Sequence, residues 1–315
     1  MWRPVSTLKI PHYDIVKLQE KGFIYCEDIQ NVLSSNPDEI PESVKTIIDR
    51  HKIKEQIDFN NVPKIHTLSD LWEYECHNSP VAVFHKGLDK LLNGGLQIGR
   101  ITELCGGPGS GKTQMCFQFA IDAQMPSALG GSASEVLFIS TDLSFSRDRI
   151  TEMGSETINH VKKILPSHNF TLDSILQNIS LIQIQGYEEL VHVINNIHDF
   201  FETNKNVKLL IVDSFSLPFV CGFTDLLERT KIVNDLLEIL LRLAMKHEFA
   251  VVLTNQLTTL ILSDSKKKLI PSLGESFGHR MHTRLLLDNG KVCLTKSINQ
   301  NVISTQFKIT TAGIR

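Results

Sequence analysis

Eight consecutive residues of this 315-residue chain have the types and the spacing that bind phosphate groups. They read G-G-P-G-S-G-K-T and satisfy the pattern G-x-x-x-x-G-K-[ST], after an apolar run and at the start of a helical stretch. Glycines let backbone N–H groups converge on phosphates, the lysine reaches the β- and γ-phosphates of ATP, and the threonine hydroxyl contacts Mg²⁺. A glycine-rich turn without a ligand would not need all of these positions filled. The residues predicted to hold ATP are Gly106, Gly107, Pro108, Gly109, Ser110, Gly111, Lys112 and Thr113.

Two further apolar runs end in aspartates that would belong to the same site. Lys208–Ser214 reads K-L-L-I-V-D-S, and a buried strand of this kind delivers one carboxylate, Asp213, to the Mg²⁺ that Thr113 also contacts. Val136–Asp142 reads V-L-F-I-S-T-D and places its aspartate at the carboxyl end of a strand, where ligands bind in open α/β sheets. Asp142 either orients the water that attacks ATP or caps the helix that begins within residues 144–149.

A fourth element combines a polar strand end with a basic segment. Gln256 follows the apolar run Ala250–Thr254, and its amide is predicted to contact the γ-phosphate and to report its presence. The next segment, Leu262–Arg284, has five basic and two acidic residues and no clean periodicity, so we expect a long loop. Such a loop either binds nucleic-acid phosphates or is a solvated surface loop. The dense cluster in it is Lys266, Lys267 and Lys268.

The composition limits the classes of function. The formal net charge of −3 argues against a chain that binds nucleic acid over its whole surface, so a DNA contact requires a local patch. No apolar run approaches the length of a membrane span, which is about 18 residues. The six cysteines form no C-x-x-C pair and no signal peptide is seen, so we expect buried free thiols in a reducing compartment and no cysteine zinc site.

The chain changes character along its length. Residues 1–55 have helix-like apolar intervals and predict a small helical domain, and the polar residues 56–80 predict a linker. Residues 81–315 alternate short apolar runs with amphipathic stretches, which predicts an α/β core with a mostly parallel sheet covered on both faces. The expected strands are Ile101–Cys105, Val136–Ser140, Ser180–Ile184, Leu209–Val212 and Ala250–Thr254, and the expected helices are Lys112–Gln124, Tyr187–Glu202 and Asp225–His247. Further strands are expected at Arg284–Asp288, Val292–Lys296 and Thr305–Thr310, with a turn at Asn289-Gly290.

These elements, in this order, resemble the RecA-type recombinase family. The similarity covers roughly residues 65–315 and is greatest to the eukaryotic paralogs of the strand-exchange recombinase, among them the C-type paralog. The N-terminal helical region also resembles the small helical domain of the family, more weakly. The stretches that carry the resemblance are Gly87–Gly95, Gly106–Met115, Gln124–Gly131, Pro271–His279 and Thr283–Leu285.

The resemblance implies a RecA-like P-loop ATPase core, with ATP between neighbouring subunits and two loops that face DNA. The first loop would be about Leu217–Arg229, where Arg229 is the only basic residue, and the second would be the basic segment. The implied activity is a DNA-dependent ATPase that acts in the nucleus, in homologous recombination, double-strand break repair and meiosis. The implied partners are other recombinase paralogs, the strand-exchange recombinase and single-stranded or branched DNA.

Three departures from the family pattern qualify this expectation. The family usually has Glu-Gly where this chain has Asp142-Leu143, and the missing methylene sets the carboxylate back by about 1–1.5 Å, so we expect slow hydrolysis. The linker lacks an F-x-x-A sequence of the kind the recombinase uses to polymerise; Phe117–Ala120 fits that pattern but would lie in the core. The chain ends at Arg315 without a basic tail that would serve nuclear import.

Four functions remain to be weighed. The main reading is an ATP-binding recombinase paralog that acts on DNA as a subunit of a hetero-oligomer. The alternatives are a non-hydrolysing structural adaptor, a filament-forming strand exchanger and an unrelated hexameric helicase. The P-S-L-G-E-S-F-G-H stretch disfavours the helicase, while Asp142 and the linker disfavour the strand exchanger.

Overall fold

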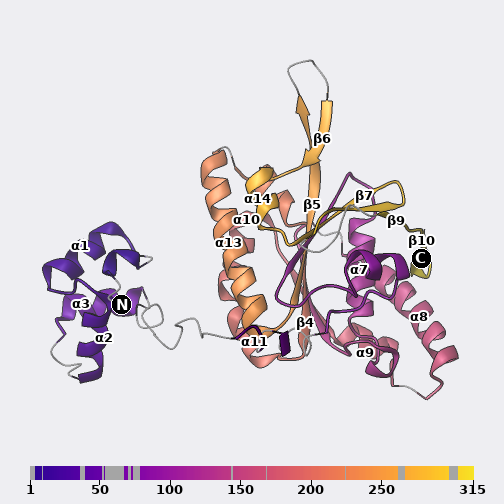
Figure 1. Cartoon of the computed structure of the whole chain (residues 1–315), viewed down its shortest axis with the longest axis horizontal. Helices are drawn as coiled ribbons and strands as arrows, with labels where there is room; N and C mark the ends of the chain where they lie inside the picture. Colours follow the sequence, from indigo (N-terminus) through magenta and orange to yellow (C-terminus); the bar gives the residue numbers. More distant parts are fainter. Residues whose placement is uncertain are drawn as a thin grey trace. The chain divides into compact units, whose positions relative to one another are not determined.

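The computed structural model divides the chain into two units, Met1–Glu73 and Tyr74–Arg315 (Figure 1). It describes residues 4–8, 10–35, 40–51, 53, 67–69, 72–73, 79–142, 145–167, 169–223, 225–261, 267–297 and 304–315. The division into residues 1–55, 56–80 and 81–315 stays a prediction, because most of residues 56–80 lie outside the described residues.

The described part of the first unit is helical, as its apolar spacing predicts. A short 3-10 helix, η1 (Val5–Thr7), is followed by α1 (His12–Glu20), α2 (Cys26–Ser35) and α3 (Glu42–Arg50). Each helix contributes aliphatic side chains to one cluster, among them Leu18, Ile29 and Ile48, which are all less than 3% exposed.

The second unit is built on one sheet, with strands in the order β3-β2-β4-β5-β1-β7-β8-β9. Neighbouring strands from β3 to β7 pair in parallel, and the pairs β7–β8 and β8–β9 are antiparallel. The predicted fold class and the Asn289-Gly290 turn are therefore confirmed. The strands are β1 (Ile101–Gly106), β2 (Glu135–Ser140), β3 (Ile179–Gln183), β4 (Val207–Asp213), β5 (Ala250–Ile261), β6 (Lys267–Pro271), β7 (Thr283–Asp288), β8 (Lys291–Lys296), β9 (Ser304–Gln306), β10 (Ile309–Thr310) and β11 (Gly313–Ile314).

Helices cover both faces of the sheet (Figure 1). Strand β2 shows the reason, because alternate side chains point to opposite faces: Val136 and Phe138 join one core, and Leu137 and Ile139 join the other. The first core includes α7 (Lys112–Asp122), α8 (Arg147–Ile164) and α9 (Leu172–Gln177), and the second includes α10 (Gly186–Asn196), α11 (His198–Thr203), α12 (Ser216–Cys221), α13 (Leu226–His247) and α14 (Gly274–Arg280). The remaining elements are α6 (Lys86–Leu91) and η4 (Ser127–Leu129).

The described part of Leu262–Arg284, residues 267–284, is not the long loop that we expected, and residues 262–266 lie outside the described residues. Strand β5 continues to Ile261 and pairs with β6 in an antiparallel hairpin, which projects beyond the rest of the core in Figure 1. Helix α14 then fills much of the remaining segment. The run L-T-T-L-I that follows Gln256 is rich in β-branched residues, which favour strands, and it supplies the partner with which residues 267–271 of the predicted loop pair.

The region Leu217–Arg229 is likewise not a loop. It contains α12 and the first turn of α13, whose N-cap Asp225 accepts hydrogen bonds from Leu227 N and Glu228 N. Helix α12 forms because Pro218 and Phe219 bury their side chains against the second core.

Two smaller expectations have different outcomes. Phe117 and Ala120, which fit the F-x-x-A pattern, are 1% and 0% exposed in α7 and belong to the core, as predicted. Among the described cysteines, Cys26, Cys105 and Cys116 are buried as expected, whereas Cys221 is exposed and Cys293 is partly exposed. Among the described helices, none has both the length and the apolar character needed to cross a membrane.

Candidate nucleotide-binding site

The phosphate-binding loop connects β1 to α7. Gly109 and Gly111 adopt φ values of +73° and +98°, a left-handed backbone that side chains with a Cβ rarely adopt. Gly111 also lies so close to the C-terminal segment that a Cβ there would meet Ile309 Cδ1 at 2.9 Å. The glycines therefore allow both the turn and its close packing, and they direct the N-terminal end of an eleven-residue helix at the loop.

Lys112 lies across this loop. Its Nζ donates hydrogen bonds to the carbonyl oxygens of Gly106 and Gly107, each at 2.9 Å. Burial lowers the pKa of Lys112, and the negative charge of Asp213 opposes that shift. The ammonium group is thus half-buried beside a carboxylate, in the position where a β/γ-phosphate would be neutralised.

Asp213 ends β4 with its side chain 2% exposed. Its Oδ1 accepts a hydrogen bond of 2.6 Å from Thr254 Oγ1, whereas Oδ2 is buried and has no hydrogen-bond partner among the described residues. Burial raises the pKa of Asp213, and the hydroxyls of Thr113 and Thr254 oppose the rise. Asp213 Oδ2, a carboxylate oxygen without a hydrogen-bond partner, and the nearby Thr113 hydroxyl are suitable ligands for Mg²⁺, which prefers oxygen. The roles of Asp213 and Thr113 as metal ligands stay predictions.

Asp142 follows β2, the neighbour of β4. Ser140 is in register with Asp213, and Thr141 N donates to Asp213 O at 2.9 Å. Asp142 and Asp213 therefore lie at the carboxyl ends of neighbouring parallel strands. The alternative role as a helix cap is wrong, since the N-cap of α8 is Ser146, whose side chain accepts from Arg149 N. Orientation of the attacking water stays a prediction.

Gln256 lies in β5 opposite the start of the phosphate-binding loop. It is in parallel register with Gly106, and its N–H donates to Ser216 Oγ at 3.0 Å. The backbone position suits a group that senses the γ-phosphate, and the contact itself stays a prediction.

A cavity of about 500 Å³ adjoins the phosphate-binding loop. Its lining comes from the loop, the β7–β8 turn and the C-terminal segment, at residues 107–110, 288–290 and 307–310. The C-terminal segment is held there by Arg149, whose side chain donates to Gln114 Oε1 at 2.7 Å and to Thr311 O at 3.1 Å. The volume is in the range of cavities that hold a small molecule.

The sequence did not predict a buried network of polar side chains next to β1, the strand that leads into the phosphate-binding loop. Glu103, in β1, is 0% exposed; its Oε2 accepts from Arg284 Nε at 2.5 Å and its Oε1 from Asn255 Nδ2 at 2.7 Å. Asn255 also donates to Ser272 O at 2.9 Å. The network thus joins β1, β5, β7 and the end of the β5–β6 hairpin. The available signal was a charged residue inside the otherwise apolar run Ile101–Cys105.

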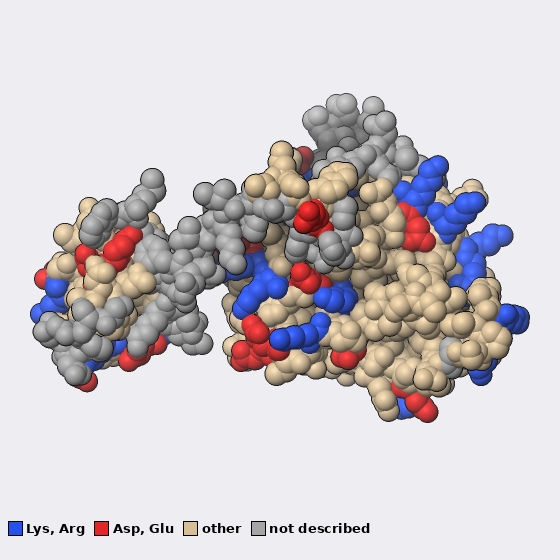
Figure 2. All heavy atoms as spheres, turned by 60° about the horizontal axis from the view of Figure 1, so that its bottom comes forward, with Lys and Arg blue, Asp and Glu red and all other residues tan. Residues whose placement is uncertain are grey.

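The predicted DNA-binding residues are spread over two elements. Arg229 lies in the first turn of α13 and is partly buried. Lys267 and Lys268 lie in β6, opposite Ile261 and Leu260, while Lys266 and the side chains of the other two lysines lie outside the described residues. On the face shown in Figure 2, described Lys and Arg form separate small groups, several of them beside Asp or Glu.

Comparison with known proteins places this chain in a family. The Rad51 family profile matches residues 81–315. The chain is 34% identical to DNA repair protein RAD51 homolog 3 of Cricetulus griseus over 95% of its own length and 88% of that protein. It is 35% identical to DNA repair protein RAD51 homolog 3 of Dictyostelium discoideum, over 76% of its length and 66% of that protein. It is 30% identical to DNA repair protein RAD51 homolog 2 of Mus musculus, over 64% of its length and 63% of that protein. The chain therefore belongs to the Rad51 family, and the resemblance expected from its motifs is confirmed.

Proposed function

We propose that this chain is an ATP-binding recombinase paralog that acts as one subunit of a complex in homologous recombination and DNA double-strand break repair, including meiotic recombination in the nucleus. One observation carries the proposal: in a chain of the Rad51 family, Lys112 lies across a phosphate-binding loop, and Asp213 and Asp142 lie at the carboxyl ends of neighbouring parallel strands. ATP and Mg²⁺ are the proposed cofactors. Other recombinase paralogs, the strand-exchange recombinase and single-stranded or branched DNA are the proposed partners.

Each residue of the site has a separate proposed role in binding or hydrolysing ATP. The residues of 106–111 other than Pro108, which has no backbone N–H, present N–H groups to the phosphates, and Lys112 neutralises the β- and γ-oxygens. Asp213 and Thr113 would hold Mg²⁺, which supplies further positive charge against the phosphates when it is bound. Asp142 would hold the attacking water by accepting its hydrogen bond.

The experiment that tests the proposal is purification of the chain from its own cells under conditions that preserve complexes. We expect stable co-purification of other Rad51-family chains, and failure of the Lys112→Ala variant to restore survival after double-strand breaks in cells that lack the chain. Full restoration by Lys112→Ala would show that ATP binding has no part in the function.

A non-hydrolysing structural adaptor is the second candidate function, because the side chain of Asp142 is one methylene shorter than the glutamate that the family usually has to orient the attacking water. ATP turnover by the purified complex, with and without single-stranded DNA, separates the two. The proposed enzyme turns over slowly and is stimulated by DNA, whereas an adaptor binds ATP without turnover.

Asp142→Glu should raise the rate of ATP turnover with little change in ATP affinity. The longer side chain returns the carboxylate by about 1–1.5 Å toward the γ-phosphate, and catalytic placement is sensitive on that scale. Steady-state turnover and equilibrium ATP binding are measured on the same complex, with Leu143→Gly added if the local turn needs restoring. A fall in turnover would mean that Asp142 is already correctly placed or has another role.

Replacing Lys266, Lys267 and Lys268 together with alanine should flatten the salt dependence of DNA binding. Each phosphate contact contributes about 0.7 to the slope of log K against log salt on single strands, so the slope should fall by up to roughly 2. Affinity is measured across a salt series within the same partner complex, with ATP binding as the control that should not change. An unchanged slope would assign the lysines to solvent or to a protein partner.

A further inference from the structure

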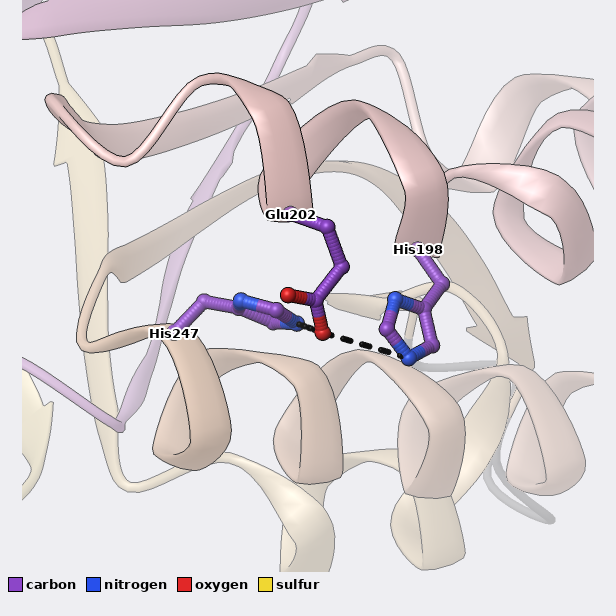
Figure 3. Close-up of side chains that lie close together, drawn as sticks. All are labelled: His198, Glu202 and His247. Carbon is purple, nitrogen blue, oxygen red and sulfur yellow. Dashed lines mark ion pairs between the residues drawn. The ribbon is translucent and has the colours of Figure 1, made fainter. Parts of the chain in front are cut away.

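Three metal-ligating side chains converge between two helices of the second core. His198 and Glu202 are four residues apart on α11 and therefore share one face of that helix. His247 is the last residue of α13. Figure 3 shows the carboxylate of Glu202 pointing between the two imidazole rings.

The distances between the ligand atoms suit a small cation. Glu202 Oε1 lies 3.7 Å from His198 Nε2 and 3.9 Å from His247 Nε2, and all three ligand atoms lie within 4.8 Å of one another. Bonds of about 2.0–2.1 Å in a tetrahedral arrangement place neighbouring ligand atoms about 3.3–3.5 Å apart. The side chains of His198 and Glu202 are 44% and 47% exposed, so small rotations of these two can close the difference.

His247 supplies an independent reason to look for a ligand. Its side chain is only 10% exposed, yet its Nε2 is buried without a hydrogen-bond partner among the described residues. The ring stacks on Phe201 with the centroids 5.8 Å apart, which holds Nε2 toward Glu202. A buried nitrogen without a partner is uncommon and calls for an explanation.

Lys246 shows that the cluster attracts positive charge. Its Nζ lies 2.9 Å from Glu202 Oε1 and 3.0 Å from His198 Nε2. The side chain of Lys246 is 54% exposed, so it can leave the cluster for solvent without losing packing. A metal ion and this ammonium group would compete for the same two acceptors.

We propose that His198, Glu202 and His247 bind one Zn²⁺ ion. Two imidazoles and one carboxylate form a donor set that zinc proteins use, with a fourth position left for water or for a side chain from a partner subunit. Hard cations such as Mg²⁺ prefer oxygen ligands and would not choose two nitrogens.

The position of the cluster separates it from the ATP site. Helix α11 leads into β4 and α13 into β5, so the ion would lie near the N-terminal ends of these parallel strands. The phosphate-binding loop and Asp213 lie at the opposite end of the sheet, at the C-terminal ends of β1 and β4. The ion would therefore join α11 to α13 without taking part in ATP chemistry.

The test is a Zn²⁺ titration of the purified, chelator-treated full chain by calorimetry, without nucleotide. Every protein carries Cys221→Ser, because an exposed thiol also binds zinc. We expect one site per chain, and a loss of affinity of at least about tenfold in His247→Ala and in Glu202→Gln. His192→Ala, at an exposed histidine of α10, is the matched control and should bind as the parent protein does.

Lys246→Met should change the Zn²⁺ affinity in the opposite direction. Removal of the competing ammonium should raise the affinity by up to about fivefold, the upper range of one exposed ion pair. Glu202→Gln exchanges one exposed polar side chain for another, so loss of the fold would not explain its effect. Equal Zn²⁺ affinities for the parent, His247→Ala and Glu202→Gln would overturn the proposal and leave the cluster as an ion pair between Lys246 and Glu202. Because no nucleotide is used, that outcome leaves the proposed ATP function untouched.

Discussion

Lys112→Ala weakens ATP binding by about 10²- to 10⁴-fold, because two hydrogen bonds to charged phosphate oxygens are lost at about 1.5–3 kcal/mol each. In the structure, Lys112 Nζ lies within 2.9 Å of two loop carbonyl oxygens, so its side chain already extends across the phosphate-binding loop. The measurement is equilibrium binding of a fluorescent ATP analogue, with far-UV circular dichroism to verify folding. Lys162→Ala removes an exposed lysine of α8 and should leave the affinity unchanged. Equal binding by Lys112→Ala and the parent would contradict the assignment of the loop.

Glu103→Ala destabilises the second unit by about 3–5 kcal/mol, the range for removing one partner of a buried ion pair. The substitution removes the hydrogen-bond acceptor of Arg284 Nε and one acceptor of Asn255 Nδ2. Glu103 and Asn255 are both 0% exposed, so water does not replace the lost carboxylate there. Urea unfolding followed by far-UV circular dichroism measures the change in free energy. The matched control is Glu238→Ala, which breaks an exposed pair with Arg242 and should cost less than about 1 kcal/mol.

A double variant distinguishes the loss of the Glu103–Arg284 ion pair from the loss of side-chain packing around it. Glu103→Met with Arg284→Met replaces both charges by apolar side chains of similar length, and such exchanges are often neutral or stabilising. We therefore expect the double variant to be more stable than Glu103→Ala. If it is less stable, the polar bonds to Asn255 matter more than the ion pair.

The sequence predicts those parts of the fold whose signal is local. The phosphate-binding loop needs glycines at φ values that other residues avoid, so its pattern is visible in eight consecutive letters. Strands β2 and β4 contain continuous apolar runs because both of their faces are buried. Helix α8 was expected only by its start within residues 144–149, because its buried side includes Gly154 and Thr157, which narrow the apolar stripe that would mark its length.

The rest depends on contacts between distant segments. Glu103 and Arg284 are 181 positions apart and meet only because β1 pairs with β7. His198 and His247 meet because α11 packs on α13, and no spacing in the sequence connects them. The region Leu217–Arg229 was expected to be a loop from family resemblance, although its apolar residues had a core to join.

The length and continuity of strand β5 have a consequence for how a movement at the nucleotide loop would be transmitted. It runs without interruption from Ala250, through Gln256 in register with Gly106, to Ile261, and residues 262–266 that follow lie outside the described residues. The five residue steps beyond Gln256 span about 17 Å at about 3.4 Å per residue. A rod of that length, tilted by about 5° at Gln256, would displace its far end by about 1.5 Å. The hairpin thus extends from a point beside the nucleotide loop, and a small rotation at Gln256 becomes a displacement at Ile261 that is large enough to make or break a hydrogen bond there.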